Sequence, residues 1–188
     1  MSRRHARCSC PAFAILACDV SDVPEGYALA ELFGSARGEM VEHIPHCRRL
    51  GMTVEQVRPR AARVRLPYRD ELVGDPVRRV VFGGVITTLL DHASGLAVFC
   101  SLSELKAIAT LDLRIDYLRT AEPGLDLVGE AECYKLTTHV AFVRAAAWER
   151  VPDDPFASCL ATFMIGANPA DSPMARALRA RARTRGAP

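Results

Sequence analysis

The sequence lacks any apolar run as long as the ~18–20 residues that cross a membrane as a helix. It also lacks a C-x-x-C pair, and its seven cysteines are an odd number that disulfides alone cannot pair. His5, Cys8 and Cys10 make at most one corner of a metal site, because no second corner follows. We therefore predict a cytoplasmic protein in a reducing compartment, with no membrane partner, no metal and no cofactor.

Positive charge is scarce in the middle of the chain and concentrated at its two ends. The 188 residues have a formal net charge of +2, but the first 17 carry three arginines and no acid. The last 20 carry five arginines against one aspartate, so the remaining residues have a net charge of −5. An acidic body does not suit a nucleic-acid surface, and we predict no nucleic-acid partner.

Composition divides the chain into three segments. Residues 1–22 contain Arg3 and Arg4 before a short apolar run, so they resemble a very short export signal or a disordered or mis-assigned start. Residues 23–168 are predicted to form one domain, beginning with a helix from Pro24 to near Pro45. Residues 169–188 form a basic tail rich in Arg and Ala, either a frayed helix or disordered.

Lys, Arg and Glu are also absent from the most distinctive stretch, Phe82 to Cys100. Apolar residues stand there at positions 86, 89, 90, 93, 96, 97 and 100, which is the spacing of one helix face. The other face has almost no charge, so the sequence predicts a buried helix. Its single carboxylate, Asp91, needs an explanation because burial of an unpaired charge is costly.

The start of this helix supplies a second feature. Gly83 and Gly84 have no side chain that can cap the first turn or keep a ligand away from the free N–H groups. Asp91 follows two turns later, on the same broad side as Thr87 and Thr88. The helix thus offers both an oxyanion donor and a carboxylate base. The alternative interpretation is a glycine turn before a core helix whose aspartate is held by threonine hydroxyls.

Alternating patterns around this helix predict strands joined by short turns. The clearest is Ile108 to Leu118, in which Leu111, Leu113, Ile115 and Tyr117 are expected to face inward and Thr110 outward. Residues 71–79 are expected to be a loop. The predicted strands are 52–57, 61–68, 108–118, 127–137, 140–149 and 156–166. Short turns make them antiparallel, which predicts an α+β fold with five to six strands curled round one long buried helix.

From Pro45 to Gly166 the sequence resembles the hotdog-fold acyl-CoA thioesterases, most closely the phenylacetyl-CoA (PaaI-like) type. The resemblance rests on the order and spacing of several short matches, each weak alone. They are Pro45-His46-Cys47, Leu50-Gly51-Met52, Leu66-Pro67-Tyr68, Gly83-Gly84-Val85-Ile86 with Asp91, the run from Asp112 to Arg119, and Ala161-Thr162-Phe163.

The resemblance implies hydrolysis of an acyl-CoA thioester to a free acid and CoA. The family's His-Gly-Gly motif falls on Phe82-Gly83-Gly84, and the main-chain N–H of Gly83 would polarise the thioester carbonyl. Asp91 would act as base or nucleophile across a dimer interface, and Thr110 would help to hold the attacking water. The expected assembly is a homodimer or homotetramer with shared active sites. The expected substrate-binding residues are Phe82, Gly84, Thr88 and Arg119.

The chain departs from the family pattern because Phe82 replaces the histidine. The main-chain donor survives this exchange, so we expect a weakened enzyme rather than an inactive one. His92 is a candidate replacement base, although it lies about 100° round the helix from Asp91. A non-catalytic acyl-CoA-binding or regulatory protein is the alternative, and a dehydratase, which needs a His–acid pair, ranks last.

Overall fold

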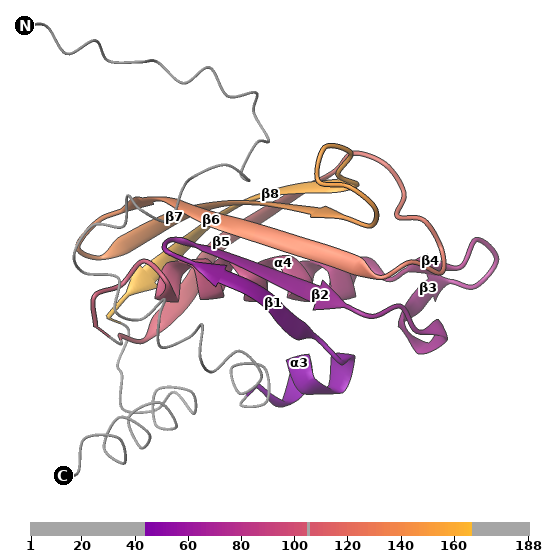
Figure 1. Cartoon of the computed structure of the whole chain (residues 1–188), viewed down its shortest axis with the longest axis horizontal. Coiled ribbons are helices and arrows are strands. Elements are labelled where there is room, and N and C mark those ends of the chain that lie inside the picture. Colours follow the sequence, from indigo (N-terminus) through magenta and orange to yellow (C-terminus); the bar gives the residue numbers. More distant parts are fainter. Residues whose placement is uncertain (1–43, 105, 167–188) are drawn as a thin grey trace, which may run out of the picture.

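The computed structural model describes residues 44–104 and 106–166, and these form one antiparallel sheet and one long helix (Figure 1). The predicted segment 1–22, the helix from Pro24 and the tail 169–188 lie outside the described residues. A short helix, α3 (Pro45–Leu50), which the pattern analysis did not predict, begins the described chain with Pro45 in its first turn. It ends at Gly51, whose φ of 74° is readily adopted by glycine.

The sheet has six strands in the order β1-β2-β6-β7-β8-β5, and every neighbouring pair is antiparallel. This confirms the predicted α+β architecture, and each predicted strand is present within a few residues of its expected bounds. The strands are β1 (Thr53–Arg58), β2 (Ala61–Leu66), β5 (Ile108–Tyr117), β6 (Leu127–Leu136), β7 (Val140–Trp148) and β8 (Ala157–Ile165).

Helix α4 (Gly83–Phe99) is the centre of the fold, and the sheet curls over it (Figure 1). Leu89, Leu90 and Ala93 are completely buried against the sheet. Full burial of each leucine contributes about 1.5–3 kcal/mol. At Gly129 of β6 an added Cβ would lie 2.9 Å from the Leu89 side chain, so this glycine allows helix and sheet to approach closely. The prediction of a buried central helix is confirmed.

The prediction of a loop at residues 71–79 is wrong. Two short strands, β3 (Val73–Asp75) and β4 (Val80–Val81), form a hairpin after a single 3₁₀ turn (Asp70–Leu72). The Asp75 carboxylate accepts hydrogen bonds from the main-chain N–H groups of Val77 and Arg78 and closes the turn. Strands of three and two residues are too short to show alternation, so the pattern had no signal there.

The expected alternation along β5 is wrong in its first half. The pairing with β8 shifts register between Thr110 and Asp112, which leaves Leu111 as an extra residue that is 56% exposed. The bulge places Ile108 and Thr110 on the same side as Leu113 and Ile115, facing α4. A prediction from strict alternation necessarily places Thr110 on the wrong side.

Candidate active site

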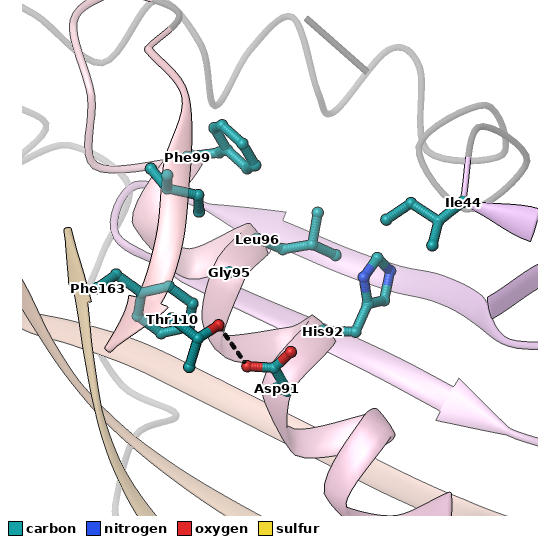
Figure 2. Close-up of a pocket in the computed structure, with 9 residues that line it drawn as sticks. Ile44, Asp91, His92, Gly95, Leu96, Phe99, Thr110 and Phe163 are labelled. Atoms are coloured by element: carbon teal, nitrogen blue, oxygen red, sulfur yellow. Dashed lines mark hydrogen bonds between the residues drawn. The ribbon is translucent and has the colours of Figure 1, made fainter. Parts of the chain in front are cut away.

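A cavity of about 160 Å³ lies between the second half of α4 and strands β5 and β8 (Figure 2). Asp91 and Thr110 form a polar edge, and His92 stands on another part of the wall. The remaining surface is apolar and comes from the helix, the two strands and the start of the described chain. Those residues are Ile44, Gly95, Leu96, Phe99, Ile108 and Phe163.

Asp91 is held by a hydrogen bond from the opposite element. The Thr110 hydroxyl donates to Asp91 Oδ1 at 2.9 Å, a contact made possible by the bulge in β5 (Figure 2). Asp91 is half-buried and Thr110 is exposed, so the carboxylate lies at the mouth of the cavity rather than in the core. A carboxylate in this position can accept a proton from water or attack a carbon atom directly.

Thr87 and Thr88 do not hold Asp91. Their hydroxyls donate to the carbonyls of Gly83 and Gly84, four residues earlier, at 3.1 and 3.0 Å. The alternative interpretation expected a threonine partner for the aspartate, and the structure supplies one from β5 instead. Thr88, a predicted substrate-binding residue, therefore has its hydroxyl proton directed at the helix backbone.

The start of α4 has no side-chain cap. Tyr117 of β5, which the sequence analysis did not assign to the site, donates from its hydroxyl to the Gly83 carbonyl at 3.2 Å. A Cβ at position 83 would lie 3.2 Å from the same hydroxyl. Tyr117 therefore fixes the first helical turn against the edge strand, and a side chain at position 83 requires its hydroxyl to shift by a few tenths of an ångström.

Phe82 lies beside this turn and is 61% exposed. Its ring covers Gly84 so closely that a Cβ there would lie 2.5 Å from a ring carbon. Its N–H donates to the Leu72 carbonyl at 2.8 Å, which ties the helix start to the hairpin. The aromatic side chain that replaces the family histidine is thus outside the cavity that contains Asp91.

One chain does not bring the two predicted catalytic groups together. Gly83 and Asp91 are eight residues apart in one helix, which corresponds to about 12 Å along the axis. A reacting carbonyl needs its oxygen about 3 Å from the donor and its carbon about 3–3.5 Å from the attacking atom. These requirements cannot both be met by Gly83 and Asp91 of the same helix.

Burial shifts the pKa values of two other titratable groups near the cavity, His92 and Cys159. It lowers the pKa of His92 to about 4, so the imidazole is uncharged at neutral pH. Burial also raises the pKa of the Cys159 thiol to about 12, with a further contribution from the negative charge of Asp91. No hydrogen bond joins His92 to Asp91 among the described residues, so the pair that a dehydratase needs is not formed there.

Arg119, predicted to bind substrate, is engaged inside the chain. Its guanidinium donates to both oxygens of the buried Glu149 at 3.0 and 2.7 Å. Its other hydrogen bonds go to the Asp154 carboxylate and to the carbonyls of Asp154 and Thr120. All five N–H donors therefore have partners, an arrangement that disfavours a contact with CoA phosphates.

Within residues 44–104 and 106–166, His, Cys, Asp and Glu side chains form no group of three or more that can hold a metal ion. None of the helices described there is long and apolar enough to cross a membrane.

Comparisons with known proteins identify the family and the fold. Residues 79–154 match the model of the thioesterase superfamily. The chain is 32% identical over 143 residues to the medium/long-chain acyl-CoA thioesterase YigI of Escherichia coli K12, covering 69% of this chain and 91% of that protein. It is also 37% identical over 94 residues to a Halobacterium salinarum protein, of which the match spans 61%, less than two thirds.

Two solved structures illustrate the likeness in fold. A Pseudomonas aeruginosa protein has a TM-score of 0.63 and 41% identity, covering 71% of this chain and 98% of that one. The phenylacetic acid degradation protein PaaI of Thermus thermophilus has a TM-score of 0.57 and 22% identity, covering 64% and 97%. The second match concerns the fold alone.

Proposed function

Because this chain belongs to the thioesterase superfamily, we propose that it is a thioester hydrolase that cleaves acyl-CoA to a free acid and CoA, with Asp91 as the reacting carboxylate. The predicted resemblance to hotdog-fold thioesterases, with PaaI among the structural neighbours, is confirmed. The observation that carries the proposal is the Asp91 carboxylate at the mouth of an apolar cavity, oriented by Thr110.

In the general-base route, Asp91 removes a proton from water while the water oxygen attacks the thioester carbon. The tetrahedral intermediate then collapses, the C–S bond breaks, and the CoA thiolate takes the proton back from Asp91. In the nucleophilic route, an Asp91 oxygen attacks the carbon, CoA thiolate leaves, and water hydrolyses the resulting anhydride. In both routes the apolar walls receive the acyl chain.

The oxyanion donor in this proposal is the Gly83 N–H of a second copy of the chain. It stands at the positive end of the α4 dipole, where developing negative charge is stabilised. Since about 12 Å separates the two groups within one helix, the complete site requires two chains. Strand β5 is an edge of the sheet and presents the exposed Leu111 and Tyr117. Pairing of two such edges would form a homodimer and remove an open edge.

A panel of short, medium and aromatic acyl-CoAs, with the released thiol followed by a colour reagent, tests the activity. Asp91→Asn should lower kcat/KM by about 10²–10⁴, the usual contribution of a general base. Asp153→Asn is the control, because Asp153 is an exposed carboxylate in the turn between β7 and β8, outside the cavity and outside β5. Equal thiol release by wild type and Asp91→Asn would contradict the proposal.

Phe82 favours one alternative, a non-catalytic acyl-CoA-binding protein. Its ring covers Gly84 and gives the helix start no side-chain hydrogen-bond donor. The alternative expects saturable acyl-CoA binding without turnover, and Phe82→His should not create activity. Hydrolysis by wild type that increases in Phe82→His would reject it.

A further inference from the structure

His92 is the polar residue of the cavity that the proposed hydrolysis does not use. It follows Asp91 on α4 but turns to another part of the wall, toward Ile44 (Figure 2). His92 is 8% exposed, and away from the polar edge of Asp91 and Thr110 its neighbours in the cavity wall are apolar. A large polar ring at this place is unexpected in a pocket for a purely hydrocarbon chain.

The Nε2 atom of His92 is buried and has no hydrogen-bond partner among the described residues. Two other buried polar atoms there share this property, Arg69 Nε and Ser94 Oγ, but neither residue lines the cavity. A buried nitrogen without a partner destabilises a protein, so such atoms usually serve a ligand, a water or a reaction. Of these three residues, His92 is the one that lines the cavity.

We propose that His92 determines the acyl specificity by a hydrogen bond between Nε2 and a hydroxyl group on a short, otherwise apolar acyl chain. This inference rests on the proposed hydrolysis of acyl-CoA. The uncharged imidazole has one donor nitrogen and one acceptor nitrogen. A hydroxyl both donates and accepts, so it satisfies Nε2 in either tautomer, whereas a carbonyl oxygen satisfies only one.

The size and shape of the cavity agree with this substrate class. Its volume of about 160 Å³ is smaller than the ~300–1,000 Å³ of pockets for drug-sized ligands, so it suits a short chain. Leu96 and Phe163 would pack against the methylene groups. Because Nε2 lies inside the wall in this structure, the proposed hydrogen bond requires the ring to turn about its Cβ–Cγ bond. No hydrogen bond of Nε2 within the described chain opposes that turn.

The test compares butanoyl-CoA with 2-hydroxybutanoyl-CoA and 3-hydroxybutanoyl-CoA in wild type, His92→Leu and His92→Gln. Wild type should cleave one of the two hydroxy compounds with a kcat/KM about tenfold higher than that for butanoyl-CoA. His92→Leu should reduce that ratio to one or below, and His92→Gln, which keeps a donor and an acceptor, should retain part of it. A wild-type ratio near one, or a ratio unchanged in His92→Leu, would overturn the inference.

Binding separates this inference from the proposed hydrolysis. Calorimetry on Asp91→Asn should show that the hydroxy compound binds more tightly than butanoyl-CoA. The same measurement is made on wild type if it cleaves none of the three thioesters. The preference should be lost when His92→Leu is added. Hydrolysis of butanoyl-CoA without any His92-dependent preference overturns the inference and leaves the proposed function. His92-dependent binding without hydrolysis overturns the proposed function alone.

Two further measurements exclude a merely structural role. The ¹⁵N chemical shift of His92 Nε2 should move with the hydroxy ligand and not with butanoyl-CoA. His92→Leu removes an unpartnered buried nitrogen, so its melting temperature should be no lower than that of wild type. A lower melting temperature together with an unchanged substrate ratio would assign the ring to the core and overturn the inference.

Discussion

Glu130 on β6 and Asp91 on α4 are both carboxylates inside the same small fold, but their surroundings differ. Glu130 is 1% exposed and is paired with Arg58 at 2.5 Å and with Arg63 at 2.9 Å. Asp91 is half-buried at a cavity, and the hydrogen bond found for it comes from the neutral Thr110. A carboxylate whose oxygens are taken by two guanidinium groups is a structural element, whereas one with a single neutral partner remains available for chemistry.

Glu149, directly after β7, repeats the structural pattern. Its side chain is 1% exposed and is bound by Arg119 through both oxygens. It also accepts the main-chain N–H of Glu122 at 2.6 Å. Buried, arginine-paired carboxylates therefore differ in role from the one at the cavity, and this difference can be tested by substitutions that should affect stability or catalysis but not both.

The largest expected effect is on stability, from Glu130→Ala. Removal of this carboxylate leaves Arg58 and Arg63 without their shared partner, and the free energy of unfolding should fall by about 3 kcal/mol. Urea denaturation measures the loss, and kcat/KM of the folded enzyme should stay within about twofold. Glu132→Gln on the same strand is the control, because the more exposed pair of Glu132 with Arg144 should contribute about 1 kcal/mol or less. Equal losses for the two variants would contradict the distinction.

The next effect is a pH dependence of stability caused by His92. Burial lowers its pKa in the folded protein to about 4, against 6.5 for a histidine exposed to water. The unfolded chain therefore binds the proton first as the pH falls, and stability should decrease between pH 6.5 and pH 4 by roughly 3 kcal/mol. Urea denaturation across this range should show a smaller slope for His92→Leu than for wild type. Parallel profiles for wild type and His92→Leu would contradict the prediction.

The smallest effect is expected from Thr110→Val, which removes the hydroxyl partner of Asp91 without removing the carboxylate. A hydrogen bond from a hydroxyl to a carboxylate contributes about 1.5 kcal/mol at the lower end of its range, so kcat should fall by about tenfold. Thr120→Val, at an exposed threonine outside the cavity, is the control and should retain full activity. A kcat unchanged in Thr110→Val would show that the hydroxyl does not orient the reacting group.

Periodicity was sufficient to predict the helix that begins at Gly83 and the six strands around it, because long elements repeat their pattern several times. Periodicity did not predict the hairpin β3–β4, whose strands are too short for an alternating pattern to repeat. It also did not predict the bulge at Leu111, where one extra residue moves the preceding side chains to the other side of the sheet. The side of β5 that Thr110 occupies therefore could not be derived from alternation.

The site was predictable to a lesser extent. Asp91 stood out because an uncharged helix carries one acid, and Thr110 entered only through the family resemblance. The engagement of Arg119 with Glu149 joins residues 30 positions apart and has no local signal. The burial of His92 also depends on how the sheet and the start of the described chain meet α4, so its uncharged state became evident only in three dimensions.

The most direct test of the account is complementation between two damaged chains. Asp91→Asn removes the carboxylate, and Gly83→Pro removes the main-chain donor; each homodimer should be folded and almost inactive. Heterodimers purified through two different affinity tags contain one intact pair of Asp91 and Gly83 if each site draws on both chains, so they should recover about half of the wild-type activity. Heterodimers as inactive as the two parents would contradict a site in which Asp91 of one chain acts with Gly83 of the other.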